Sequence, residues 1–258
     1  MSAPLKILAV GNSFSVDCTH YLAQVANDLG TPVVIGNLYI GGCSVQRHYD
    51  SALADLHEYI YYKTTDGNWA ETPEASINTG LDDEDWDVVV MHQCSPYSGA
   101  PETFTCLPLL VDYVRAHAPH ARLIWNMTWA YQHDSTHKHF PRYGRDQAAM
   151  YAAIVGCLGR CVDPLNIYET IIPTGTAVQN ARTGFLGDTL TRDGFHLSYN
   201  IGRLLGAMCW YQGITGNSVD TLTFNPDPEI VTPEVMALLK ESAKNAFACP
   251  RAVTPSKL

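Results

Sequence analysis

Two short motifs at opposite ends of the 258-residue chain carry residue types that could perform acyl transfer. Near the start, an apolar run over 5–10 breaks at a Gly-Asn-Ser turn, which places Ser13 directly after an expected buried strand. Near the end, Asp193 precedes His196 by three residues, which puts acid and base on one side of a helical turn. A serine becomes a nucleophile when a histidine takes its proton and a carboxylate orients that histidine. We therefore predict a catalytic triad in which Ser13 is the nucleophile, His196 the base and Asp193 the orienting acid.

Each motif alone also has a purely structural interpretation. Ser13 could cap the helix that follows it, since serine and asparagine are preferred caps, although Ser15 is better placed for that role. Asp193 could likewise cap a helix and leave His196 as an ordinary polar residue. The presence of both motifs in one chain favours the catalytic interpretation.

Apolar segments that alternate between strand and helix patterns must bring the two motifs together. Strands are expected at 5–10, 33–40, 86–92, 121–129 and around 168–172. Helices are expected at 17–29, 46–59, 107–116, 147–160, 197–211 and 233–247. Repeated β-α-β units predict a parallel sheet with helices on both faces, and ligands bind such sheets at the carboxyl ends of the strands. Ser13, Gly41 with Gly42, and the segment 93–98 follow the first three expected strands, so we expect them to share that edge.

One segment, 61–85, does not fit the alternation. Asp66-Gly67 between β-prone residues predicts a hairpin, and we interpret the segment as an insertion that projects from the sheet. The acidic run at 82–85 is interpreted as a solvated approach to the third strand rather than a metal site. No internal repeat or linker is evident, so the chain 1–258 is expected to be one domain.

Charge and hydropathy limit the classes of partner. A formal net charge of −10 argues against nucleic acid and anionic membranes, which need basic surfaces, and leaves a small neutral substrate open. No apolar run reaches the ~20 residues of a membrane span, and the amino terminus lacks a signal-peptide pattern. From the sequence as written we expect a cytoplasmic protein. A leader peptide removed beforehand would leave no trace in it. Assembly into a homo-oligomer is compatible with the sequence.

The cysteine and histidine patterns do not predict a metal or another cofactor. Most of the eight cysteines lie in apolar segments without a Cys-x-x-Cys pair, which favours buried free thiols. His133 and His137 could share a metal at helical spacing, but the polar segment around them, with Pro141 close by, favours a mobile surface loop. His92 on the third strand is expected to be a hydrogen-bonded interior histidine. No phosphate-binding or dinucleotide-binding glycine motif occurs.

The two motifs carry a family resemblance. The sequence from Gly11 to Ser15 resembles the first signature block of the SGNH (GDSL-type) hydrolases, and Asp193-Gly194-Phe195-His196 resembles their last block. The resemblance spans about 5–210. Within the superfamily, the finer sequence pattern is similar to that of a poorly characterised bacterial subgroup. It implies a flavodoxin-like three-layer α/β/α sandwich around a parallel sheet of about five strands, with a small hairpin insertion.

The resemblance also implies an oxyanion hole with three donors. Two are the backbone N–H of Ser13 and a glycine N–H after the second strand, best matched by Gly42 with Gly41 beside it. The third is a side-chain amide after the third strand, where the family's Gly-x-Asn-Asp pattern is absent. Gln93 is the expected replacement and Ser95 the fallback, and a missing donor would cost roughly 10²–10³ in turnover.

The resulting functional hypothesis is a serine esterase that hydrolyses a small acyl ester, with O-acetyl groups on a carbohydrate as the suggested substrate. Trp129 and Tyr131, after the fourth strand, could stack on a sugar or could equally belong to the rim of the core. The main alternative is a non-catalytic carbohydrate-binding protein on the same scaffold, motivated by the altered third block. A further alternative is a metal-dependent hydrolase that uses His133 and His137.

Overall fold

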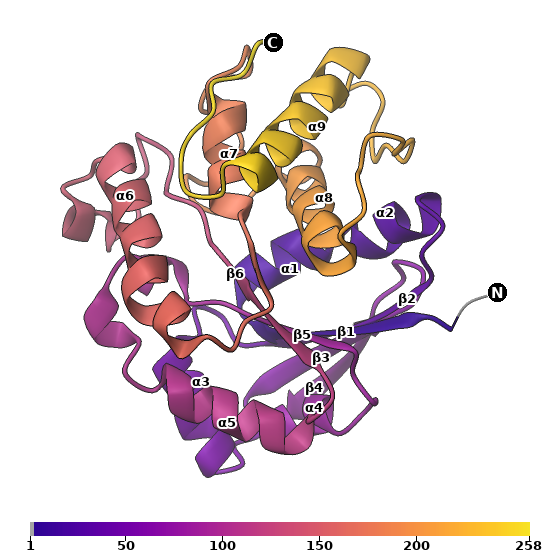
Figure 1. Ribbon diagram of the computed structural model, residues 1–258, viewed down its shortest axis with the longest axis vertical. Coiled ribbons are helices and arrows are strands. Elements are labelled where there is room, and N and C mark those ends of the chain that lie inside the picture. Colours follow the sequence, from indigo (N-terminus) through magenta and orange to yellow (C-terminus); the bar gives the residue numbers. More distant parts are fainter. Residues whose placement is uncertain (1–2) are drawn as a thin grey trace.

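The computed structural model describes residues 3–258, in which a seven-stranded sheet separates two layers of helices (Figure 1). Its strands occur in the order β4-β3-β2-β1-β5-β6-β7, and the five strands other than β3 and β4 are parallel. The strands are β1 Leu5–Gly11, β2 Val33–Tyr39, β3 Tyr59–Thr64, β4 Ala70–Ala75, β5 Val88–Met91, β6 Arg122–Asn126 and β7 Thr170–Ile172. The predicted three-layer α/β/α sandwich with five parallel strands is therefore confirmed.

Nine α-helices surround this sheet within the described part of the chain. They are α1 Ser13–Thr19, α2 Leu22–Asp28, α3 Val45–Leu53, α4 Ile77–Leu81, α5 Leu107–His117, α6 Gln147–Cys157, α7 Thr174–Arg182, α8 Ile201–Thr215 and α9 Pro233–Ala248. Helices α3, α4 and α5 lie together on one side of the sheet, and α1, α2 and α8 lie on the other, with α7 and α9 packed on α8 (Figure 1). Because helices cover both faces, the central strands β1 and β5 are apolar almost throughout and buried.

Several expected helices differ from the observed ones at their ends; the helix expected at 197–211, for example, is observed as α8 at Ile201–Thr215. The helix expected at 17–29 begins four residues earlier, at Ser13, because Asn12 caps it by accepting a hydrogen bond from the Phe14 N–H. It also divides into α1 and α2. The helix expected at 46–59 stops at Leu53, where the chain turns through Asp55 with φ of 45°. The residues that follow enter strand β3.

The segment predicted to project from the sheet instead extends it. Strand β3 pairs antiparallel with β2, with Asn37 opposite Tyr62, and β4 pairs with β3 to form the edge. The hairpin was correctly predicted but its pairing was not, because the free edge of β2 offers a row of unpaired backbone groups that a hairpin can satisfy. The acidic run is ion-paired, since Lys63 Nζ lies 2.6 Å from Asp83 and 2.7 Å from Glu84.

Most of the thiols lie in the buried core, whereas one long apolar helical segment is only partly buried. All eight cysteines are free; five are buried, while Cys106 and Cys161 are half-buried and Cys249 is exposed. The helical segment 147–165 is long and apolar enough to cross a membrane by length and composition alone. A single such helix is weak evidence, because core helices of soluble proteins meet the same criterion.

Because two histidines are buried, we expect the folded protein to lose stability in mild acid. Burial lowers the pKa of His48 to about 3 and that of His92 to about 4, and the Nε2 atom of each lacks a partner among the described residues. An unfolded histidine has a pKa near ~6.5, so the unfolded chain binds more protons below that pH. Stability is therefore fully present above pH ~6.5 and falls towards pH ~4, by up to about 1.4 kcal/mol per pH unit for each histidine. Urea midpoints should decline from pH 7 to pH 5; constant or rising midpoints would contradict this assignment.

Candidate active site

Ser13 stands at the first position of α1, at the carboxyl end of the central strand β1. The turn before it requires glycine, because a Cβ at Gly11 would lie 2.4 Å from His92 Nε2 and from Ser15 Oγ. Asn12 then fixes the turn, since its side-chain N–H donates to the Cys43 carbonyl at 3.0 Å. The local sequence thus presents the Ser13 hydroxyl at the edge of the sheet where the other parallel strands also end.

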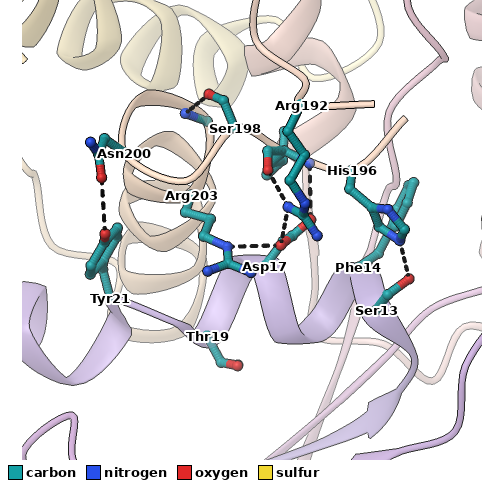
Figure 2. A network of polar contacts seen from close by, with 12 residues as sticks. Ser13, Phe14, Asp17, Thr19, Tyr21, Arg192, His196, Ser198, Asn200 and Arg203 are labelled. Atoms are coloured by element: carbon teal, nitrogen blue, oxygen red, sulfur yellow. Dashed lines mark hydrogen bonds and ion pairs between the residues drawn. The ribbon is translucent and has the colours of Figure 1, made fainter. Parts of the chain in front are cut away.

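The structure brings the three predicted catalytic residues into contact across 183 positions of sequence. Ser13 Oγ lies 2.8 Å from His196 Nε2, and His196 Nδ1 lies 2.6 Å from Asp193 Oδ2. Figure 2 shows the His196 ring pointing down onto Ser13 from the segment that also carries Arg192. The expected hydrogen bond between hydroxyl and imidazole is therefore present, and each of the two ring nitrogens has its own partner.

Asp193 is held in place by its own turn. Its Oδ1 accepts hydrogen bonds from the backbone N–H groups of His196 at 2.8 Å and Phe195 at 3.2 Å. Burial raises the pKa of the Asp193 carboxyl, but the hydrogen bonds from the His196 ring and backbone together lower it by more. The pKa of this carboxyl therefore lies below its usual value. The carboxylate is consequently ionised at neutral pH and can stabilise a charged imidazole.

A buried ion network joins α1 to the segment that bears His196 (Figure 2). Asp17 is fully buried, and its Oδ1 lies 2.9 Å from both Arg192 Nη1 and Arg203 Nε. Its Oδ2 accepts a hydrogen bond from the Leu197 N–H at 2.9 Å. Because Asp17 is one turn beyond Ser13 and Leu197 directly follows His196, this network fixes the nucleophile relative to the base. The sequence alone indicated no role for Asp17 beyond the start of a helix.

The glycines after β2 reach the site, whereas Gln93 does not. Gly42, with φ of 63°, lines the same cleft as Ser13. The Gln93 side chain is buried elsewhere: its Nε2 donates to the Thr103 carbonyl at 3.1 Å, and its Oε1 accepts from the Val45 N–H at 3.0 Å. The Gln93 amide is therefore not positioned to donate to an oxyanion, contrary to expectation. Ser95, the second candidate for this donor, does line the cleft.

The predicted sugar-stacking wall is wrong. Trp129 is fully buried and lies parallel to the Phe14 ring with centroids 3.9 Å apart, and its indole N–H donates to the Phe195 carbonyl. Tyr131 is also fully buried, and its hydroxyl lies 2.9 Å from Ser95 Oγ. Both aromatic side chains are core residues that hydrogen-bond to residues of the cleft wall, Phe195 and Ser95. This agrees with their alternative interpretation as part of the core.

The cleft itself has a volume of about 420 Å³. Its walls are Asn12, Ser13, Tyr39, Gly41, Gly42, Ser95, Pro96, Tyr97, His137, Lys138, His139, Phe195 and His196. Tyr97 belongs to the segment 93–98 that was expected at this edge, whereas Tyr39 and the histidines of the 137–139 segment were not predicted to belong to this site. Only their positions at or after strand ends could have indicated it.

The segment expected to be a mobile loop is attached to the catalytic turn. The Gln132 N–H donates to the Gly194 carbonyl at 2.8 Å. His133 bonds instead to Asp188, 2.8 Å away, while His137 faces the cleft. Within residues 3–258, no group of three or more His, Cys, Asp or Glu side chains is arranged to hold a metal ion.

The fold is that of the SGNH (GDSL-type) hydrolases. A putative SGNH hydrolase from Slackia heliotrinireducens aligns over 82% of this chain and 100% of its own, with 18% identity and a TM-score of 0.55. A lipase/acylhydrolase from Enterococcus faecalis aligns over 82% and 96%, with 14% identity and a TM-score of 0.53. These likenesses concern the fold.

Residues 6–246 match the model of the DUF4886 family, described as a domain of unknown function, and the chain belongs to this family. A DUF4886 family protein from Bacteroides uniformis, known from a crystal structure, is 37% identical over 98% of both chains, with a TM-score of 0.91. No curated protein sequence matches.

Proposed function

We propose that this protein is a serine esterase that hydrolyses a small acyl ester through an acyl-enzyme. The observation that carries the proposal is the hydrogen-bonded series from Ser13 through His196 to Asp193 at the wall of an open cleft. A nucleophile, a base and an orienting carboxylate within hydrogen-bonding distance are the functional parts of acyl transfer. The shared fold with the SGNH hydrolases supports the same chemistry.

In the proposed mechanism, His196 Nε2 removes the Ser13 proton as Oγ attacks the ester carbonyl carbon. The resulting imidazolium is stabilised by Asp193, and its proton then passes to the leaving alcohol as the carbon–oxygen bond breaks. Water attacks the acyl-enzyme in the second half of the cycle, with His196 again acting as base and returning the proton to Ser13. Ester and water are consumed, and acid and alcohol are released.

The oxyanion would be held by the backbone N–H groups of Ser13 and Gly42, two residues that line the cleft. Since Gln93 is engaged elsewhere, Ser95 is the candidate for a third donor. Two fixed backbone donors are sufficient for substantial stabilisation, because each oxyanion donor is worth roughly 3–4 kcal/mol in a preorganised site.

An O-acetyl group on a carbohydrate is the substrate class we propose. Its support comes from the lining of the cleft, in which Tyr39 and Tyr97 provide aromatic surface in place of the buried Trp129 and Tyr131. Aromatic side chains with a polar tip suit the mixed apolar and hydroxylated faces of a sugar.

A fluorophosphonate probe tests whether Ser13 is activated. Such a probe phosphonylates a serine hydroxyl that has lost its proton to a neighbouring base, with fluoride as the leaving group. We expect stoichiometric labelling of the native protein, located at Ser13 by peptide mass mapping, and no labelling after denaturation in urea. An unlabelled native protein, or a label distributed over other serines, would favour the non-catalytic carbohydrate-binding alternative.

A further inference from the structure

The lining of the cleft beside Ser13 lacks acidic side chains although the whole protein is acidic, and the nearby Asp193 carboxylate is engaged by His196. The chain carries a formal net charge of −10, yet none of the thirteen residues that line the cleft is an aspartate or glutamate. Three of them, His137, Lys138 and His139, form a continuous basic segment on one wall. Such an acid-free region in an acidic protein is expected to attract anions and to repel other acidic surfaces.

Lys138 has no partner of opposite charge within the part of the chain that the structure describes. Among the described residues, Lys138 is exposed and forms no ion pair, and Lys240 and Lys257 form none either, whereas Lys6, Lys63 and Lys244 each lie within 4 Å of a carboxylate. Burial, together with the positive charges of His139, Lys138 and His196, lowers the pKa of His137, and the Asp193 carboxylate offsets this shift only in part. The basic groups of this wall thus repel one another, and an anion bound among them would relieve that repulsion.

The chain just before the basic segment is anchored to Asp188 and, through the Gln132 N–H, to the Gly194 carbonyl of the catalytic turn. The carboxylate of Asp188 accepts hydrogen bonds from His133 and from Gln147, and it forms an ion pair with the buried Arg182 at 2.6 Å. Within the segment, the His139 N–H donates to His137 Nδ1 at 3.2 Å. The backbone that carries Lys138 is therefore held at a fixed position in the cleft wall.

The segment also lies on one particular side of the reacting atoms. The His137 ring packs 4.7 Å from the Phe195 ring, which in turn lies 4.1 Å from His196. In ester hydrolysis the base returns its proton to the leaving alcohol, so the alcohol must lie beside His196. Lys138 lines the same cleft as His196, so an alcohol bound beside His196 lies in the part of the cleft that this basic wall borders.

We propose that the preferred substrate is an ester whose alcohol carries an anionic group, such as the carboxylate of an acidic sugar, which Lys138 and the neighbouring histidines bind. This inference rests on the proposed esterase function and specifies its substrate class. A carboxylate on the alcohol would form charge-assisted hydrogen bonds with Lys138, and these would orient the scissile ester above Ser13.

The test compares two matched acetate esters, 4-acetoxybenzoate and its neutral methyl ester, methyl 4-acetoxybenzoate. Their acyl groups are identical, and only the alcohol part differs in charge. We expect the ratio of kcat/KM for the anionic ester over the neutral ester to fall about five- to tenfold in Lys138→Ala and further in Lys138→Glu. Comparing this ratio between variants cancels the intrinsic reactivities of the two esters.

Lys244→Ala is the matched control, because it removes one positive charge from α9, outside the cleft, and should leave the ratio at the wild-type value. The wild-type ratio should also decrease when the salt concentration is raised from low to high, since salt screens exposed charges. A ratio that is unchanged in both Lys138 variants, with hydrolysis intact, would overturn this inference and leave the esterase function standing. If neither ester is hydrolysed, both this inference and the proposed esterase function would be overturned.

Discussion

Ser13→Ala should slow the turnover of a simple activated ester, such as nitrophenyl acetate, by roughly 10⁴–10⁶ while leaving the fold intact. The substitution removes the attacking oxygen, whose side-chain partner among the described residues is His196 Nε2 at 2.8 Å. Serine hydrolases that lose a triad member lose about this much, and backbone oxyanion donors supply the activity that remains. Initial rates over a range of substrate concentrations, together with a urea midpoint, measure both quantities.

Ser218→Ala provides the control for this loss. Ser218 is exposed and lies after α8, outside the cleft, so its substitution should preserve wild-type rates. A Ser13→Ala protein that is folded and retains more than about a tenth of the wild-type turnover would exclude Ser13 as the nucleophile.

Asp17→Ala should lower the free energy of unfolding by about 3–5 kcal/mol, because it leaves two arginines without their shared buried partner. Both Arg192 and Arg203 bond to the same carboxylate oxygen, and the other oxygen holds the Leu197 N–H. The chain can neither expose these groups without opening α1 from α8 nor neutralise guanidinium groups at ordinary pH. Urea denaturation followed by tryptophan fluorescence would measure the change.

Asp220→Ala is the matched comparison for Asp17→Ala. Asp220 is exposed and lies 3.9 Å from Lys244, so its removal should change stability by less than about 0.5 kcal/mol. A loss below about 1 kcal/mol in Asp17→Ala would show that the network contributes little to holding α1 against the His196 segment.

The position of the site could be predicted from the sequence because it depends on topology. Parallel strands joined by helices must end at one edge of the sheet, and Ser13 and Gly42 directly follow two such strands. Asp193 and His196 are close in sequence, so their mutual contact needs only a local turn. These features require no knowledge of which way a particular side chain points.

Side-chain direction accounts for what the sequence could not provide. The amide of Gln93 turns to Thr103 and Val45, two partners that tertiary packing alone supplies. Tryptophan is a residue type that often lines binding sites, but the ring of Trp129 is covered by the stacked ring of Phe14. Asp17 was similarly unpredictable, since its partners come from residues 175 or more positions away.

The hairpin at the edge shows the same limit for the backbone. Asp66 and Gly67 indicated the turn correctly, yet nothing local indicates which strand a hairpin will join. The pairing of β3 with β2 depends on the exposed edge left by the parallel sheet, which exists only once the chain has folded.

The central claim is that Ser13 and His196 act as one unit, and a double-variant comparison tests it most directly. Turnover of the same nitrophenyl ester would be measured for Ser13→Ala, for His196→Ala and for the two substitutions combined. Groups that share one proton transfer are non-additive, so we predict that the double variant is no slower than the slower single variant. Losses that multiply, each substitution reducing turnover by its own factor, would show that the two residues act independently and would contradict the mechanism.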